Sequence, residues 1–224
     1  HGGGKNIKKK LDKNNIESKF IDGLRVTDGK TIKIVEEALL ELNTEILNNI
    51  KDKEANAQSV TPRNENIIKI IPEKKELGFV GTPKEVNKEV LLSIVRKKKV
   101  PIIVPLGIGD DGKIYNINAD VAAAAIAKEI NSRRLLLMTD VEGVLDKDKK
   151  LISEINSETA NNMINDQSIS GGMIPKIKTC IDAVNNGVTG VVIVDGRRQN
   201  SLLFEIFSDK GAGTLIRKWK ILKK

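Results

Sequence analysis

Two short segments near the start of the chain combine residue types that bind anions. Three glycines at positions 2–4 let a ligand approach the backbone, and consecutive amide groups at the start of a helix hold negative charge. Further along, Arg25 follows a turn at Asp22 and Gly23, and its planar guanidinium can donate two parallel hydrogen bonds to a carboxylate. Alone, each segment also fits a plainer interpretation: a flexible loop or tag remnant for the glycines, and a solvated surface residue for the arginine.

Polar residues recur at every second position before an alanine-rich segment. Asn116, Asn118 and Asp120 alternate with apolar residues, and alternation in an extended chain sends such residues to one side. The pattern predicts a polar cluster where a strand turns into a helix. Taken by itself, it fits equally well an asparagine or aspartate that caps the helix.

The second half of the chain holds two further segments that could do chemistry. Residues 140–145 follow a short apolar run, and nucleotides in open α/β sheets lie at such positions; the alternative is an ordinary loop. Lys176 follows Gly171 and Gly172 just inside a predicted helix start. A cation at that end opposes the helix dipole, so a functional reason for the lysine is favoured over a structural one.

Regular elements must hold these segments in place, and the apolar pattern predicts several helices. A long one begins at Thr31, which can cap it, because apolar residues recur at intervals of three and four. Those residues are Ile32, Val35, Leu39, Leu42, Ile46 and Ile50. Further helices are predicted around residues 86–95, 121–130 and 176–186, and Gly187 is placed to end the last one.

Short apolar runs at residues 100–106, 135–139 and 190–194 predict buried strands, and residues 56–75 predict an antiparallel excursion. The alternation of strand, loop and helix predicts an α/β fold, with helices on both faces of a mostly parallel sheet. Ligands in such sheets bind where loops leave the carboxyl ends of the strands. We expect two lobes, residues 1–106 and 107–224.

Composition narrows the class of protein. With 224 residues, 39% hydrophobic and only 3% aromatic, the chain predicts a globular protein whose core is built from aliphatic side chains. The formal charge of +8 comes mostly from scattered lysines, such as those at residues 8–10, which favours solvated faces over a nucleic-acid site. Cys180 stands alone in a helical pattern and predicts a core thiol in a reducing compartment. The apolar runs are too short to cross a bilayer, so we expect no membrane partner and a cytoplasmic or organelle-interior location.

Taken together and in order, the five segments resemble motifs of the acetylglutamate kinases, which belong to the amino-acid kinase family. The motifs are His-Gly-Gly-Gly at residues 1–4, Gly-Leu-Arg-Val-Thr-Asp at 23–28, Asn-x-Asn-Ala-Asp at 116–120, Asp-Val-x-Gly-Val-Leu-Asp at 140–146 and Gly-Gly-Met-x-x-Lys at 171–176. The resemblance covers nearly the whole chain. Related kinases of other substrates share the second-half motifs but usually not the first two, so substrate choice depends on the first half.

The resemblance implies a three-layer αβα fold with an open, mostly parallel sheet, and ATP and Mg²⁺ as cofactors. It implies that the first lobe binds N-acetylglutamate and dimerises, that the second lobe binds ATP, and that the assembly is a homodimer or a hexamer made of dimers. The implied substrate-binding residues are Gly2, Gly3, Arg25 and Asn116. The implied ATP-binding residues are Asp140, Val141, Glu142, Gly143, Val144 and Leu145, and the implied catalytic residues are Lys176 and Asp120, with no metal ligand among the side chains.

Three features depart from the family pattern. The family carries a Lys-x-Gly-Gly strand ahead of the glycine run, and because this chain begins at His1, we expect it to be truncated at its N-terminus and inactive in this form. A glycine-rich hairpin of the family is replaced by residues 59–64, with the sequence Ser-Val-Thr-Pro-Arg-Asn. Arginine-inhibited relatives carry a histidine near residues 199–200, where this chain has Gln and Asn, although Glu205 and Gly211 match the rest of that effector region.

Other functions stay open on the sequence. A kinase of an acylated aminoadipate would need the same motifs around a substrate one methylene longer. A catalytically dead regulatory relative would keep nucleotide affinity without turnover, and a basic binding module would show steep salt dependence toward nucleic acid.

Overall fold

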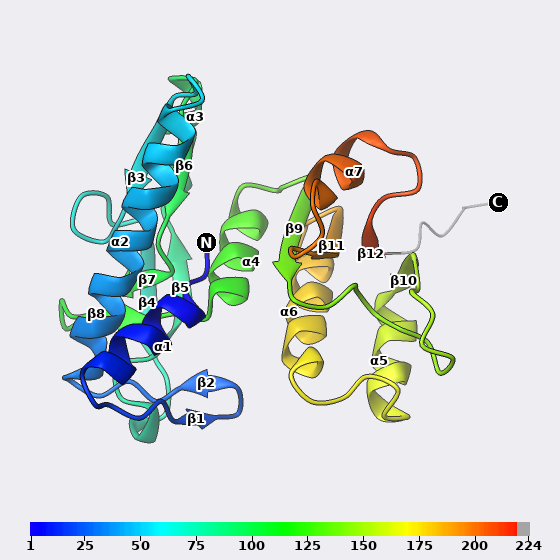
Figure 1. Cartoon of the computed structure of the whole chain (residues 1–224), viewed down its shortest axis with the longest axis horizontal. Helices are drawn as coiled ribbons and strands as arrows, with labels where there is room; N and C mark the ends of the chain where they lie inside the picture. The colour runs from blue at the N-terminus through cyan, green and yellow to red at the C-terminus, as the bar shows by residue number, and fades with distance from the viewer. Residues whose placement is uncertain (219–224) are drawn as a thin grey trace. The chain divides into compact units, whose positions relative to one another are not determined.

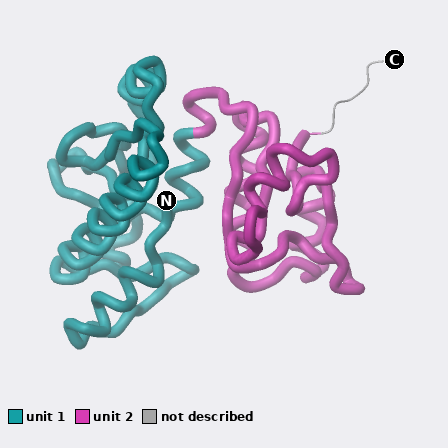
Figure 2. Tube along the Cα trace, turned by 45° about the horizontal axis from the view of Figure 1, so that its top comes forward, with its two compact units in different colours: residues 1–126 teal, residues 127–224 magenta. Residues whose placement is uncertain are grey.

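The computed structural model describes residues 1–218, and the chain divides into two compact units, His1–Ile126 and Ala127–Lys224 (Figures 1 and 2). The boundary that we expected after residue 106 therefore lies twenty residues further on, at residue 126. The reason is strand pairing, because β7 (Leu106–Ile108) runs parallel to β4 (Ile68–Pro72) and β8 (Ile114–Asn116) then pairs with β7. These strands complete the sheet of the first unit.

Unit 1 begins with helix α1 (Gly4–Lys13), the hairpin of β1 (Phe20–Ile21) and β2 (Leu24–Arg25), and the long helix α2 (Thr31–Lys51). Helix α1 packs Ile7 and Leu11 against α2, in a cluster with Val35 and Leu39. The predicted long helix is confirmed, but its cap is not Thr31. The carboxylate of Asp28 accepts hydrogen bonds from the backbone amides of Lys30 and Thr31 at 3.0 and 2.7 Å, and these bonds lower the pKa of Asp28.

Two sheets follow α2 in unit 1. Strand β3 (Ala57–Val60) pairs in parallel with β6 (Val100–Ile103), and the second sheet has the order β5-β4-β7-β8. The antiparallel excursion expected at residues 56–75 is confirmed for β4 with β5 (Gly81–Val86), but not for β3, which runs parallel to β6. A 3₁₀ turn (Lys75–Leu77) connects β4 to β5. Helix α3 (Lys88–Arg96) starts later than the pattern suggested, because Val86 ends β5 and Asn87 caps the helix.

Helix α4 (Ala119–Glu129) follows the first unit's last strand, and unit 2 contains one sheet with the order β10-β12-β11-β9. Its strands are β9 (Arg134–Thr139), β10 (Glu154–Asn156), β11 (Gly190–Asp195) and β12 (Gly213–Arg217). The pairs β9/β11 and β10/β12 are parallel, whereas β11/β12 is antiparallel. Its helices are α5 (Ser157–Asn165), α6 (Met173–Asn185) and α7 (Ser201–Phe207), and Figure 1 shows α6 lying along the sheet. The last strand within residues 1–218, β12, is thus an inner strand.

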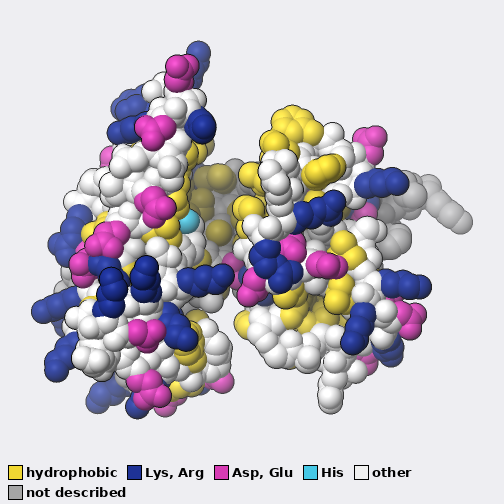
Figure 3. Space-filling view, viewed as in Figure 1, with side chains coloured by type: hydrophobic (Ala, Val, Ile, Leu, Met, Phe, Trp, Pro, Cys, Tyr) yellow, Lys and Arg dark blue, Asp and Glu magenta, His cyan; other side chains and the backbone are white. Residues whose placement is uncertain are grey.

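The mixed α/β class is confirmed, with parallel pairing in both units. The aliphatic run of β11 is buried as expected, and Cys180 of α6 is buried as a core thiol. Gly187 ends α6 with a φ of +110°, which suits glycine. Among residues 1–218, the helices all fall short of the length and apolarity needed to cross a bilayer. On the face in Figure 3, Lys and Arg side chains are interspersed with acidic and uncharged ones.

Candidate functional site

A pocket of about 190 Å³ in unit 1 brings together four residues that the sequence pointed to: Gly2, Gly3, Arg25 and Asn116. They come from the start of the chain, from β2 and from β8, so the fold joins segments that are distant in sequence. Phe20 and Asn118 also line this pocket. The pocket therefore combines backbone amides, one guanidinium and side-chain amides, which together suit a small ligand with a carboxylate and an amide.

The glycine run lies where α1 begins. Gly3 is the residue before the helix, and it makes no side-chain capping bond. Because the first amides of any helix lack partners within the helix, those of α1 are available to a negative group at this end of the pocket. A Cβ on Gly3 would lie 2.6 Å from Leu39 Cδ2, so close packing against α2 also requires glycine here.

A buried asparagine that the sequence did not indicate holds this loop. Asn43 of α2 is 1% exposed, and its amide nitrogen donates to the carbonyl oxygen of Ile102 at 2.9 Å and to Nε2 of His1 at 3.1 Å. Its oxygen accepts from Ser59 Oγ at 2.5 Å. Since the Ile102 carbonyl can only accept, the amide orientation is determined, and Nε2 of His1 must be an acceptor. Nδ1 of His1 then donates to the carbonyl of Gly2 at 2.9 Å, which fixes the direction of the glycine run.

The β1–β2 hairpin positions Arg25. Its two-residue turn has φ values of +51° at Asp22 and +80° at Gly23, as an Asp-Gly hairpin turn requires. Strand pairing places Phe20 opposite Arg25, and the guanidinium carbon lies 4.7 Å from the centre of the Phe20 ring. Arg25 Nη1 also donates to Ser18 Oγ at 2.5 Å. Burial lowers the pKa of Arg25, yet a guanidinium stays charged at any physiological pH.

The alternating polar segment divides between two roles. Asn116 ends β8, where its backbone amide donates to the carbonyl of Phe79 at 2.9 Å. Asn118 Oδ1 accepts from the amides of Asp120 and Val121 at 2.9 and 3.3 Å, so the capping interpretation applies to Asn118. The expected alternation through Asp120 is therefore wrong, because α4 already begins at Ala119. Asp120 lies in the first turn of that helix, where the dipole favours a carboxylate.

In unit 2, the segment expected to meet a nucleotide leaves the carboxyl end of β9. Asp195 at the end of β11 pairs with Thr139 at the end of β9, so both strands finish at the same edge of the sheet. Of the six predicted residues, Gly143 and Val144 are buried. The others, Asp140, Val141, Glu142 and Leu145, are exposed. The segment thus presents three exposed residues, Asp140 to Glu142, followed by the buried pair Gly143 and Val144, at the sheet edge that usually binds ligands.

An arginine that the sequence did not indicate lies at the same edge. Arg197 donates from Nε and Nη2 to the Asp195 carboxylate at 2.9 and 2.8 Å, and its backbone amide donates to Oδ1 at 2.9 Å. The Arg197 side chain lowers the pKa of Asp195 to about 2. This two-bond geometry leaves Nη1 and the exposed side of the guanidinium directed to solvent or to a ligand.

Lys176 is the fourth residue of α6 and is half-buried. The residue before the helix, Gly172, makes no side-chain capping bond, and Gly171 has a φ of +57°. The predicted position of Lys176, just inside a helix start, is therefore confirmed, while its catalytic role stays a prediction. Within residues 1–218, no three His, Cys, Asp or Glu side chains gather into a metal-binding group. Mg²⁺ in phosphoryl-transfer sites is commonly held by one or two carboxylates together with the substrate phosphates, which needs no such cluster.

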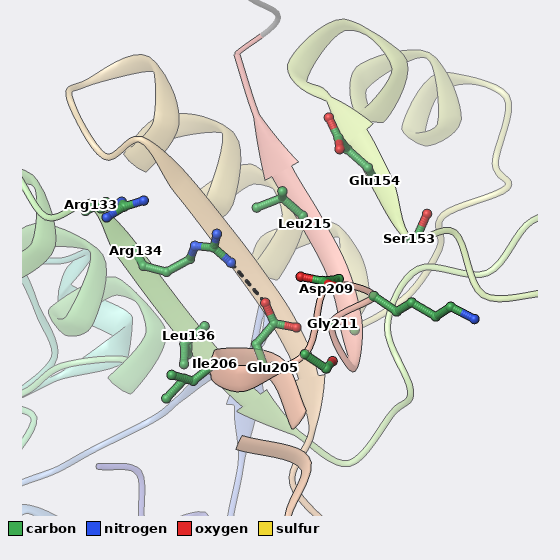
Figure 4. A pocket seen from close by; sticks show the side chains of 13 residues that line it. Arg133, Arg134, Leu136, Ser153, Glu154, Glu205, Ile206, Asp209, Gly211 and Leu215 are labelled. Carbon is green, nitrogen blue, oxygen red and sulfur yellow. Dashed lines mark hydrogen bonds and ion pairs between the residues drawn. The ribbon is translucent and has the colours of Figure 1, made fainter. Parts of the chain in front are cut away.

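A second pocket, of about 930 Å³, lies wholly in unit 2 and contains Glu205 and Gly211 (Figure 4). Glu205 is 7% exposed, forms an ion pair with Arg134 Nη1 at 3.1 Å and accepts from the amide of Ala212 at 2.8 Å. Gly211 has a φ of +65°, and a Cβ there would lie 2.8 Å from Glu205 Oε2. The structure thus brings both predicted effector residues into one charged pocket.

The fold agrees with the sequence comparison. A profile of the amino acid kinase family matches residues 1–195, and the chain belongs to this family. It is 55% identical over 217 residues to an acetylglutamate kinase of Pelagibacter ubique, covering 97% of this chain and 75% of the relative. An acetylglutamate kinase of Clostridioides difficile is 47% identical over 223 residues, covering 97% and 78%.

Solved structures give the same fold. The protein smu.665 from Streptococcus mutans UA159 superposes with a TM-score of 0.85 at 31% identity, covering 97% of this chain and 84% of that one. N-acetylglutamate synthase from Neisseria gonorrhoeae, complexed with coenzyme A and N-acetyl-glutamate, superposes with a TM-score of 0.88 at 20% identity. That match covers 98% of this chain and 51% of the synthase, and at this identity it shows the fold alone.

Proposed function

We propose that this chain phosphorylates the side-chain carboxylate of N-acetyl-L-glutamate with ATP, giving N-acetylglutamyl 5-phosphate for arginine biosynthesis. The observation that carries this proposal is the unit 1 pocket, which combines the Gly2 and Gly3 backbone, the Arg25 guanidinium and the Asn116 amide. Relatives that carry the name acetylglutamate kinase match 97% of the chain at 47–55% identity, which supports the same substrate.

The pocket chemistry fits the two ends of the substrate. Arg25 binds the α-carboxylate as a two-bond fork, stiffened by its contact with Phe20. Asn116 and the amides beside Gly2 and Gly3 bind the remaining polar groups. The reacting side-chain carboxylate is already a nucleophile, so no general base is required.

In the reaction, a carboxylate oxygen forms a bond to the γ-phosphorus of ATP while the bond between that phosphorus and the bridging β–γ oxygen breaks, and ADP leaves with the electron pair. Lys176 offsets charge on the transferred phosphoryl group, and Asp120 orients Lys176 and the second catalytic lysine, which the family carries in its Lys-x-Gly-Gly strand. Residues 140–145 hold the nucleotide, which brings Mg²⁺ on its phosphates. The protein's contribution is mainly alignment and charge compensation.

Hydroxylamine trapping of the acyl phosphate tests this function in the full-length protein. We expect turnover with ATP and N-acetylglutamate, and weaker turnover with an N-acylated aminoadipate, because one additional methylene lengthens the substrate inside a small pocket. Equal or better turnover with uridylate, aspartate or unacetylated glutamate would overturn the assignment. ATP binding without turnover would favour a regulatory relative that has lost catalysis.

We propose the unit 2 pocket as a regulatory site for arginine. Glu205 supplies a buried carboxylate next to Gly211, and the pocket has room for an amino acid. However, Arg134 already forms an ion pair with the Glu205 carboxylate, so the guanidinium of an arginine effector has to displace Arg134 from it. We therefore expect arginine to inhibit weakly, and Arg134→Ala to change the arginine concentration needed for half inhibition without changing the acetylglutamate KM. Inhibition by arginine that is insensitive to both Arg134→Ala and Glu205→Gln would place the effector elsewhere.

Family membership also supports assembly as a homodimer or a hexamer of dimers, in the cytoplasm. Sedimentation velocity of the full-length protein measures the assembly directly, and a monomer at working concentrations would contradict it.

A further inference from the structure

The loop that follows β9 doubles back on itself in two arms. Leu145 and Leu151 form an antiparallel bridge, and the amide of Ile152 donates to the carbonyl of Val144 at 2.9 Å. Val144 and Ile152 are the neighbouring opposed pair, and the two residues of such a closely bonded antiparallel pair normally exchange two hydrogen bonds. In a regular ladder the Val144 amide would therefore donate to the Ile152 carbonyl in return.

A threonine hydroxyl takes the place of that return bond. Thr214 Oγ1 accepts from the amide of Val144 at 2.8 Å and donates to the carbonyl of Ile152 at 2.6 Å. Thr214 is fully buried, at 0% exposure. Since a hydroxyl has only one hydrogen to donate, its donor is fully committed to this bridge. The hydroxyl is thus the hydrogen-bond partner of one backbone group on each arm, the Val144 amide and the Ile152 carbonyl, and it lies between the two arms at this point.

Thr214 also ties the loop to the body of unit 2. It belongs to β12, an inner strand, where it pairs with Ile193 of β11. At the loop side, Gly143 has a φ of +146°, and a Cβ there would lie 2.6 Å from Thr214 Oγ1. Glycine at this position therefore leaves the space that the hydroxyl fills. The backbone at Gly143 and Val144 is set by a residue seventy positions away in the chain.

We propose that Thr214 is a positioning residue for nucleotide binding, whose hydroxyl holds residues 143–144 in their ligand-ready conformation before ATP arrives. This inference rests on the proposed function, in which residues 140–145 contact ATP. A loop fixed beforehand binds more tightly, because less conformational freedom is lost on binding. Thr214 acts through the loop and need not touch the nucleotide itself.

Two substitutions separate the hydroxyl from the shape of the side chain. Thr214→Val keeps the volume and removes the hydroxyl, whereas Thr214→Ser keeps the hydroxyl. In full-length protein, titration calorimetry with a non-hydrolysable ATP analogue should show a Kd about tenfold higher for Thr214→Val, the order expected when one buried hydrogen bond is lost. Thr214→Ser should bind as the native protein does, and the acetylglutamate KM should stay unchanged in both variants.

Thr27→Val provides the matched control. Thr27 is also fully buried, and its hydroxyl donates to a backbone carbonyl, that of Arg25, at 2.8 Å, but it lies in unit 1. Thr27→Val should therefore leave the Kd of the ATP analogue unchanged. An equal rise in Thr27→Val and Thr214→Val would show a general loss of stability and overturn the proposal, as would equal effects of Thr214→Val and Thr214→Ser.

Hydrogen exchange of the native protein tests whether Thr214 holds the loop before ATP binds, and this measurement does not depend on the folding of any variant. The Val144 amide should exchange slowly before any nucleotide is added, because Thr214 holds it. Rapid exchange in the free protein would overturn the proposal. If the native protein bound no ATP analogue, the proposed function and the nucleotide role of Thr214 would both fall. Native binding with an unchanged Kd in Thr214→Val would overturn the role of Thr214 alone.

Discussion

Arg25→Lys separates acetylglutamate binding from ATP binding in one substitution. Lysine keeps the positive charge but donates from a single point, so the two-bond fork to the α-carboxylate becomes one bond. One hydrogen bond to a charged group is worth about 1.5–3 kcal/mol, so the acetylglutamate KM should rise about 10- to 100-fold. The side chain is 9% exposed, which leaves little room for water to replace the lost bond. The ATP KM should stay near its native value.

The substitution also removes a structural contact, so folding has to be measured alongside kinetics. The guanidinium stacks 4.7 Å from the Phe20 ring, and losing this contact lowers the free energy of unfolding by about 0.5–2 kcal/mol. Steady-state rates of hydroxamate formation give both KM values, and a urea melt gives stability. Arg96→Lys, at the exposed end of α3 and 3.9 Å from Glu89, is the matched control and should change none of these quantities. An unchanged acetylglutamate KM in Arg25→Lys, or an equal rise in the ATP KM, would refute the reasoning.

Three further predictions concern other parts of the chain. Lys176→Ala should lower kcat by about 100-fold or more with smaller changes in KM, because one preorganised charge contact is lost; a near-normal kcat in folded protein would remove Lys176 from the mechanism. Asn43→Leu should lower the free energy of unfolding by about 2–4 kcal/mol, because the buried groups that it bonds lose their partner; an unshifted urea midpoint would contradict this. The folded pKa of Asp195, about 2, lies below the ordinary value of about 3.9, so its contribution to stability is present above about pH 4 and is lost as the pH falls toward 2. A carboxyl NMR titration should find that low midpoint and an upward shift in Arg197→Gln, and an ordinary midpoint in the native protein would contradict the ion pair.

Much of the fold could be predicted because its signals are local. The three- and four-residue apolar spacing of α2 and the short apolar runs of β9 and β11 each lie within one segment, and all three elements are confirmed. The predicted burial is confirmed for β11 but not for β9, where Leu137 is buried and Met138 is 51% exposed. The Asp22-Gly23 turn is equally local. What the pattern missed depends on neighbours, as at Val86, whose apolar side chain fits a helix period but is buried in β5.

The candidate site divides in the same way. The glycine run, Arg25 and Asn116 carry their chemistry in their residue types, and the structure brings them into one pocket, while their binding roles remain predictions. Asn43 and Thr214 could not be found, because a buried polar residue matters through partners that are remote in sequence. Asn43 left only a weak signal, an amide four residues after Leu39 on the apolar face of a helix.

The inner position of β12 has a consequence for the newborn chain. During synthesis, β9, β10 and β11 leave the ribosome first, yet β10 joins the sheet only through β12, which is made last. The unit 2 sheet therefore closes only after β12 has left the ribosome, and its unpaired edges are exposed to chaperones and to aggregation until then. A polypeptide cut short before residue 213 would lack the middle of this sheet, so β10 would have no strand to pair with and one edge of β11 would stay open.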